Sequence, residues 1–170
     1  MIEYFAQSHV GLVRKGNEDS YYAPSQSRPK DPQFFLCVAD GLGGHNAGEI
    51  ASQLAVRTMV TSMQTMEGKN QMLDHPFETM QRLFFEANDK IHMLSTESEK
   101  MYGMGTTLTA AVCKKHMVCI AHVGDSRAYL FNEDGLVQIT TDHTFVQTLI
   151  QSGQLTEKAA LTHPYRHVIT

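Results

Sequence analysis

The sequence lacks the features that would place it with nucleic-acid-binding or membrane proteins. Its 14 lysines and arginines stand against 18 aspartates and glutamates, a net charge of −4, which provides no basic surface for nucleic acid or an anionic membrane. Its apolar runs are far shorter than a bilayer-spanning helix, and its first residues do not resemble a secretory signal. We therefore expect neither a nucleic-acid partner nor a membrane partner.

Cysteine is scarce, and the familiar nucleophile patterns are missing. Cys37, Cys113 and Cys119 are odd in number, lack CxxC spacing and lie in apolar stretches. This pattern indicates core packing in a reducing compartment, so we expect a cytoplasmic protein without disulfides. Neither GxSxG nor CxxxxxR occurs, and no serine, cysteine or histidine stands in an evident nucleophile setting.

The sequence does contain enough apolar material for one folded domain over residues 1–170, because 42% of it is hydrophobic and it has no internal repeat or low-complexity tract. Apolar runs and alternation predict strands at residues 4–10, 20–23, 34–39, 108–113, 117–123, 128–131 and 136–140. Three-four spacing of apolar residues predicts helices at 48–63, from 76 to about 94, at 144–152 and after 156. The polar segment 64–74 is interpreted as a connection. Two long helices beside a strand-rich region predict a helical layer on a sheet.

The most informative stretch is residues 34–48. Its apolar run predicts a buried strand that ends on Asp40, which is followed by three glycines within four residues. A carboxylate fixed at a strand end, beside glycines that permit close backbone approach, suits a hard cation such as Mg²⁺ or Mn²⁺. The alternative is that Asp40 only caps the next helix and the glycines only form a turn.

Three aspartates share this kind of position. Asp19, Asp40 and Asp125 each lie where an apolar run meets a turn, and charge near a dry core must be paired or bound to metal. Oxygen donors without clustered cysteine or histidine favour Mg²⁺ or Mn²⁺ over zinc. Arg14 adds a planar cation suited to bidentate phosphate contact. The chemistry predicted is attack of metal-activated water on a phosphoester, with two ions about 3.5–4 Å apart.

Five motifs occur in one order along the chain. They are Arg14-x-x-Asn17-Glu18-Asp19, Val38-Ala39-Asp40-Gly41-Leu42-Gly43-Gly44-His45, Met104-Gly105-Thr106-Thr107, Val123-Gly124-Asp125-Ser126-Arg127 and Thr141-Asp142-His143. Together they resemble the PP2C (PPM) family of metal-dependent Ser/Thr protein phosphatases in its bacterial form. The resemblance implies an α/β (α+β) sandwich of two mainly antiparallel β-sheets flanked by helices.

The resemblance also implies roles for the acidic residues. Asp40 is expected to bridge two Mn²⁺ or Mg²⁺ ions, and Gly41 to donate its backbone carbonyl to one of them. Glu18 and Asp19 are expected to touch the metals or to hold their waters. Asp125 resembles the ligand of a third, weaker ion. By the same resemblance Arg14 binds the substrate phosphate, and the two threonines of the third motif shape the site.

Two departures from the family pattern leave the activity of this chain open. Leu42 stands where some relatives carry a histidine that is proposed as the leaving-group acid, so a metal-bound water would have to take that role. The later acidic ligands of the family have no counterpart before Thr170, so we expect a C-terminally incomplete phosphatase domain. The alternative is a truncated or non-catalytic module with a binding or regulatory role.

The resemblance also suggests partners for the chain. The expected substrates are phosphorylated proteins, together with the Ser/Thr kinase that modifies them. If the chain ends at Thr170, an exposed sheet edge is expected to pair with another molecule and cause self-association.

Overall fold

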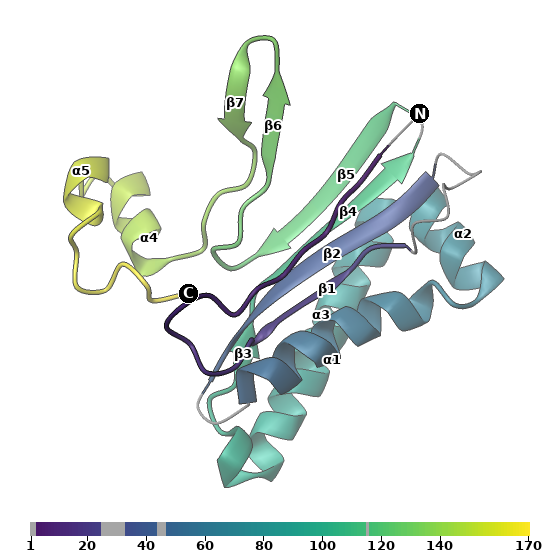
Figure 1. Cartoon of the computed structure of the whole chain (residues 1–170), viewed down its shortest axis with the longest axis horizontal. Helices are drawn as coiled ribbons and strands as arrows, with labels where there is room; N and C mark the ends of the chain where they lie inside the picture. The colour runs from purple at the N-terminus through teal and green to yellow at the C-terminus, as the bar shows by residue number, and fades with distance from the viewer. Residues whose placement is uncertain (1–2, 25–32, 44–46, 115) are drawn as a thin grey trace. The chain divides into compact units, whose positions relative to one another are not determined.

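The computed structural model describes residues 3–24, 33–43, 47–114 and 116–170 of the chain (Figure 1). They belong to two compact units, Met1–Ala121 and His122–Thr170. The first unit consists of a sheet with long helices, and the second of a hairpin and two short helices. None of the helices in the described ranges is long and apolar enough to cross a membrane.

The first unit is built on a sheet with β2 at its centre. The strands in sheet order are β1 (Asp19–Tyr22), β2 (Gln33–Leu42), β4 (Leu108–Lys114) and β5 (Met117–Val123), and the short β3 (Gly105–Thr106) also pairs with β2. The helices are α1 (Ala47–Ser62), α2 (Met66–Asp74) and α3 (Pro76–Glu97), followed by a 3₁₀ turn at Glu99–Met101. β2 runs antiparallel to β1, β3 and β4.

One face of this sheet packs against α1 and α3 to form the core. Phe35, Cys37 and Ala39 alternate along β2 and are each 2% exposed or less, as expected for successive inward positions of a strand. On α3, Met80, Leu83 and Ala87 follow the three-four spacing and are buried as well. The predicted buried strand and the predicted long helix are both confirmed.

The cysteines belong to this core. All three are free thiols; Cys37 and Cys119 are buried and Cys113 is half-buried. Burial raises the pKa of Cys37 to about 12, so its thiol stays protonated and inert at neutral pH. The prediction of core packing is confirmed for Cys37 and Cys119.

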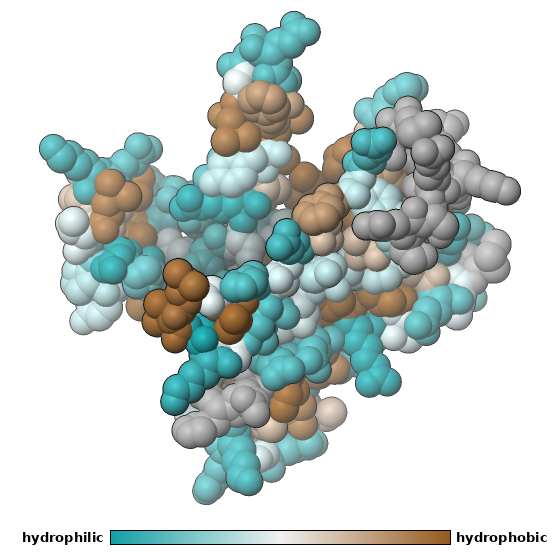
Figure 2. All heavy atoms as spheres, viewed as in Figure 1, coloured by the Kyte–Doolittle hydropathy of each residue, from teal (hydrophilic) through white to brown (hydrophobic). Residues whose placement is uncertain are grey.

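The second unit contains a two-stranded sheet, β6 (Tyr129–Asn132) and β7 (Gly135–Gln138), followed by α4 (Phe145–Gln151) and α5 (Glu157–Ala160). β6 and β7 form the predicted antiparallel hairpin, and Gly135 has the expected positive φ of +116°. Apolar side chains gather on this hairpin (Figure 2), where Phe131 is 78% exposed. The predicted fold class of mainly antiparallel sheets with helices is confirmed.

Two predictions of element type are wrong. Residues 4–10 form no strand, although their exposure alternates from one residue to the next as in an extended chain. The segment is anchored by side chains instead: the Tyr4 hydroxyl donates to the Pro24 carbonyl at 3.1 Å, and the Tyr4 ring lies 5.1 Å from that of Phe34. The apolar alternation therefore predicted the extended conformation of this segment correctly. The segment has no hydrogen-bonded partner strand within the described ranges, however, so it is not a β-strand.

The second error is the segment 64–74, which contains α2 and is not an irregular connection. Thr65 caps the helix by accepting a hydrogen bond from the Gly68 amide at 3.0 Å. A β-carbon on Gly68 would overlap the Ser62 carbonyl. Glycine is therefore needed for close packing at this turn, and the helix buries Met72 and Leu73 at its end.

Candidate active site

Asp40 is held by backbone interactions on both sides. Its amide donates to Thr107 Oγ1 at 2.9 Å, and its carbonyl accepts from the Thr107 amide at 2.9 Å and from Thr106 Oγ1 at 3.0 Å. Asp40 is exposed to solvent, although these hydrogen bonds hold its backbone in place. The predicted role of the two threonines in shaping the site agrees with these contacts.

The apolar run predicted that the strand ends at Asp40, but β2 extends beyond this residue. It continues to Leu42 because Gly41 and Leu42 pair with β3. Asp40 therefore lies inside a strand that is paired on both edges, which holds it more rigidly than a strand end would. The remaining residues of the motif, Gly44 and His45, lie outside the described residues.

Asp19 lies directly opposite Asp40 in the register between β1 and β2. Both residues are exposed. Like charges at directly opposed positions destabilise a strand pair, and a bound cation would remove that repulsion. Two carboxylates from adjacent strands are therefore the centre of the candidate site.

The turn before β1 fixes the position of Asp19. The Asp19 amide donates to Asn17 Oδ1 at 3.1 Å, and Asn17 Nδ2 donates to Ser8 Oγ at 2.7 Å. Ser8 Oγ in turn donates to the Asp19 carboxylate at 3.2 Å. The sequence analysis missed these positioning roles; the asparagine two residues before an aspartate, typical of an Asx turn, was the available signal.

Glu18 joins the strand pair to the start of α1. Its carbonyl accepts from the Gly41 amide at 3.1 Å and from Ser52 Oγ at 2.6 Å. Its carboxylate lies beside Gly48, because a β-carbon on Gly48 would come within 2.8 Å of Glu18 Oε2. A carboxylate is favourable near a helix N-terminus, and α1 begins one residue earlier at Ala47.

Gly41 and Gly48 are in direct contact. A β-carbon on Gly41 would overlap the Gly48 carbonyl and would lie 2.7 Å from the Glu18 carbonyl oxygen. Only a residue without a side chain fits between β1, β2 and α1 at this point. The glycines of the motif are therefore required for close backbone approach and do more than form a turn.

Arg14 lies at the edge of the acidic group. Its Nη1 is 4.0 Å from Glu18 Oε2, and its side chain is 77% exposed. An ion pair this long and this exposed contributes little to stability. The guanidinium therefore remains available to a ligand, as expected for a phosphate-binding arginine.

Asp125 belongs to the second unit, so its proximity to Asp19 and Asp40 stays a prediction. It follows Gly124, which is buried with a φ of +103°. The His143 amide donates to the Gly124 carbonyl at 2.7 Å, and the Gly124 amide donates to His143 Nδ1 at 3.3 Å. The Thr-Asp-His motif therefore holds the loop that carries Asp125.

A second interaction joins the same two motifs. The Arg127 guanidinium donates from Nε and Nη2 to both oxygens of Asp142, at 2.8 and 2.6 Å, in the fork geometry favoured by arginine and carboxylate.

The ring of His122 lies 5.1 Å from that of His143. Burial, and secondarily the charge of His143, lower the pKa of His122, which favours its neutral form at neutral pH.

The donor set suits a hard divalent cation, although it is only part of a complete site. Asp19 and Asp40 offer oxygen ligands, which Mg²⁺ and Mn²⁺ prefer. Among the residues that the structure describes, no group of three or more histidine, cysteine, aspartate or glutamate side chains is placed to hold a metal. Waters and the predicted Gly41 carbonyl would supply further oxygen ligands.

Comparisons with known proteins identify the family of the chain. The family described as Protein phosphatase 2C matches residues 5–148, across the boundary between the two units. The chain is 36% identical to the serine/threonine phosphatase stp of Listeria innocua, covering 94% of the chain and 62% of that protein. It is 37% identical to the serine/threonine protein phosphatase PstP of Mycobacterium tuberculosis, covering 99% of the chain and 30% of that protein.

Solved structures match equally well. A crystal structure of the M. tuberculosis phosphatase PstP/Ppp has a TM-score of 0.77 at 38% identity, covering 94% of this chain and 63% of that one. The S. agalactiae serine/threonine phosphatase has a TM-score of 0.82 at 33% identity, covering 94% and 64%. The chain thus spans less than two thirds of these relatives, and a single domain over residues 1–170 stays a prediction. On the extent of these matches, the chain belongs to the protein phosphatase 2C family.

Proposed function

We propose that this chain carries the metal-binding and phosphate-binding residues of a phosphatase that hydrolyses phosphoserine and phosphothreonine in proteins. The single observation that supports this best is the register that sets Asp19 opposite Asp40. Relatives named as serine/threonine phosphatases are 36–37% identical to the chain. A PstP catalytic domain that is 38% identical was solved in complex with two manganese ions, which supports Mn²⁺ as the cofactor here, with Mg²⁺ as the alternative.

Each residue of the site has a distinct proposed task. Asp40 and Asp19 hold the cations, while the exposed Arg14 guanidinium binds the phosphoryl oxygens of the substrate. The ions, when bound, polarise the phosphoryl group and activate water for attack. Leu42 has no proton to donate, so a water held by the bound ions would have to protonate the departing serine or threonine oxygen. Asp125 is proposed as a ligand of a third ion, and Glu18 as a partner of metal-held waters.

The direct test is hydrolysis of a phosphothreonine peptide by the purified 170-residue chain, with and without Mn²⁺. Phosphate release that rises with Mn²⁺ and disappears with a chelator is the expected result. Absence of turnover together with absence of Mn²⁺ binding would instead support the alternative below.

Replacing Arg14 with alanine is expected to raise KM for an aryl phosphate about tenfold to a hundredfold, because a charge-assisted hydrogen bond contributes about 1.5–3 kcal/mol. Steady-state kinetics on p-nitrophenyl phosphate measure the change. Lys15→Ala is the matched control, since Lys15 is the neighbouring exposed cation and is expected to leave KM nearly unchanged. Equal effects of both substitutions would remove the specific role of Arg14.

A non-catalytic binding or regulatory module is the second candidate. It is favoured by the lack of a three-ligand group among the described residues. Calorimetric titration with Mn²⁺ separates the two: a phosphatase site takes up ions, whereas a module that has lost the site gives no heat of binding.

The partners in this proposal are proteins phosphorylated by a Ser/Thr kinase, and a second copy of the chain. β1 and β5 end the described sheet on its two sides, and Met117 and Val118 at the start of β5 are more than half exposed. An apolar unpaired strand is a template for pairing with another chain. Sedimentation equilibrium is expected to give a dimer; a stable monomer at all concentrations would contradict self-association.

A further inference from the structure

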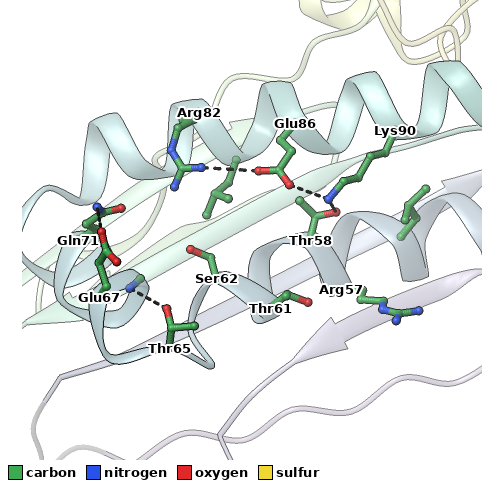
Figure 3. A pocket seen from close by; sticks show the side chains of 13 residues that line it. Arg57, Thr58, Thr61, Ser62, Thr65, Glu67, Gln71, Arg82, Glu86 and Lys90 are labelled. Carbon is green, nitrogen blue, oxygen red and sulfur yellow. Dashed lines mark hydrogen bonds and ion pairs between the residues drawn. The ribbon is translucent and has the colours of Figure 1, made fainter.

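A cavity of about 590 Å³ lies between the C-terminal half of α1, the start of α2 and the middle of α3 (Figure 3). Its volume is in the range of small-molecule sites. It is separate from the candidate active site, which lies at the other end of α1 beside Gly48. The ten residues from Gly48 to Thr58 correspond to about 15 Å of helix.

One wall of the cavity is a row of hydroxyl groups. Thr58, Thr61, Ser62 and Thr65 line it. The spacing of the first three places them on one side of α1, and Thr65 follows as the N-cap of α2. Thr58 is 5% exposed, so its hydroxyl is a buried polar group in the cavity wall. Such a row can donate and accept hydrogen bonds along the length of a polyhydroxylated ligand.

The opposite wall is a row of charges on α3. Arg82 Nη1 lies 3.6 Å from Glu86 Oε2, and Lys90 Nζ lies 2.6 Å from Glu86 Oε1. Lys90 Nζ also lies 3.5 Å from Thr58 Oγ1, which joins the two walls. Figure 3 shows the Glu86 carboxylate between the two cations. The wall therefore already holds one anionic group between an arginine and a lysine.

These ion pairs are weak enough for a ligand to replace. The side chains of Arg82, Glu86 and Lys90 are each 42–56% exposed, and ion pairs at such exposure contribute about 0–1 kcal/mol. A dianionic phosphate between the two cations would make charge-assisted hydrogen bonds to both of them.

The floor of the cavity is fixed. Thr65 caps α2 through the Gly68 amide, and the tight contact of Gly68 with the Ser62 carbonyl leaves no room for the turn to move. Gln71 Nε2 lies 3.5 Å from Glu67 Oε1, one turn apart along α2. A fixed floor is expected of a site that exists before its ligand arrives.

The chemistry of the lining defines the ligand. Three cations against two carboxylates give a net charge of +1: Arg57, Arg82 and Lys90 against Glu67 and Glu86. Leu54 and Leu83 are the apolar side chains of the lining, and none of its residues is aromatic. The lining therefore suits a polar anion and offers no stacking surface for a nucleobase. We propose that this cavity binds a small phosphorylated polyol of the sugar-phosphate class, with the phosphate between Arg82 and Lys90 and the hydroxyl groups along the threonine and serine row.

The test follows backbone amide shifts of the full ¹⁵N-labelled chain by NMR during titration with glucose 6-phosphate, inorganic phosphate or glucose. EDTA is present, so the acidic group near Asp40 holds no metal to attract phosphate. Shifts concentrated at residues 58–68 and 82–90 are expected with glucose 6-phosphate. Weaker shifts with inorganic phosphate and none with glucose would identify the phosphoryl group as the anchor and the sugar as a contributor.

Charge-removing variants test the geometry in both directions. Arg82→Gln and Lys90→Gln are each expected to weaken binding about fivefold to tenfold, and Glu86→Gln to strengthen it severalfold, because the competing carboxylate is removed. Lys100→Gln and Glu97→Gln, at exposed positions outside the lining, are the matched controls. Equal changes of affinity in the variants and in the controls would show that only the overall charge of the chain matters, and would overturn the proposal.

Two further outcomes would also overturn it. One is the absence of shifts in these segments at about 20 mM ligand, a concentration that detects even weak binding. The other is tighter binding of an acidic peptide than of any sugar phosphate, which would identify the cavity as a protein-docking site. The proposal is independent of the phosphatase assignment, since a chain without turnover would give the same titration.

Discussion

Replacing Asp40 with asparagine is expected to lower Mn²⁺-dependent hydrolysis of p-nitrophenyl phosphate by about 10³-fold or more, because stabilisation of transition-state charge depends on the bound cations. The substitution removes one charge from a side chain that lies opposite Asp19. The backbone hydrogen bonds of Asp40 to Thr106 and Thr107 do not involve its carboxylate, so the fold should be retained. Calorimetry should show a parallel loss of Mn²⁺ affinity.

Asp134→Asn is the matched control for this loss. Asp134 lies exposed in the hairpin turn, where its amide donates to Asn132 Oδ1. Its carboxylate is not one of the proposed metal ligands. Turnover should be unchanged in this variant. Full turnover in the Asp40 variant, with normal Mn²⁺ binding, would exclude Asp40 as the bridging ligand.

Replacing Gly41 with alanine is expected to lower the free energy of unfolding by about 3 kcal/mol or more, at the upper end of the range for overpacking. The new methyl group would overlap the backbone of Gly48 and crowd the Glu18 carbonyl. Backbone atoms cannot move aside as a flexible side chain can. Urea unfolding followed by circular dichroism measures the change, and Mn²⁺ affinity should fall with it because β1, β2 and α1 separate at the site.

Gly16→Ala separates this effect from a general cost of losing glycine. No atom lies within 4 Å of a β-carbon built on Gly16, and alanine there restricts the unfolded chain without a clash. Its unfolding free energy should stay the same or rise slightly. A Gly41 variant as stable as the Gly16 variant would show that the contact with Gly48 can relax.

Elements with a strong repeating pattern could be predicted from the sequence. The continuous apolar run of β2 and the three-four spacing of α3 both reflect burial against the same core. α2 was not predicted because its hydrophobic residues lie at its two ends, with a polar middle that contains Gly68. The segment 4–10 shows the converse, since extended conformation is local but strand pairing depends on a distant partner.

The candidate site was predictable as a set of residues but not as an arrangement. Motif spacing could suggest that Asp19 and Asp40 act together, yet their direct opposition depends on the register of two strands. The same holds for the Thr-Asp-His motif. Its match to the family was visible in the sequence, but its contacts with Gly124 and Arg127 join residues 15–19 positions apart, which spacing alone does not reveal.

The bare backbone contact between Gly41 and Gly48 has a mechanical consequence. Where helices usually rest on a sheet through side chains, rotamer changes can absorb small displacements. At the contact between Gly41 and Gly48 there are no side chains that could adjust in this way. Hydrogen bonds of Ser52 also connect α1 to the strand that carries Asp19. Any sliding or tilting of α1 therefore displaces the peptide unit next to Asp40, so the helix and the two strands that carry Asp19 and Asp40 move together as one rigid unit.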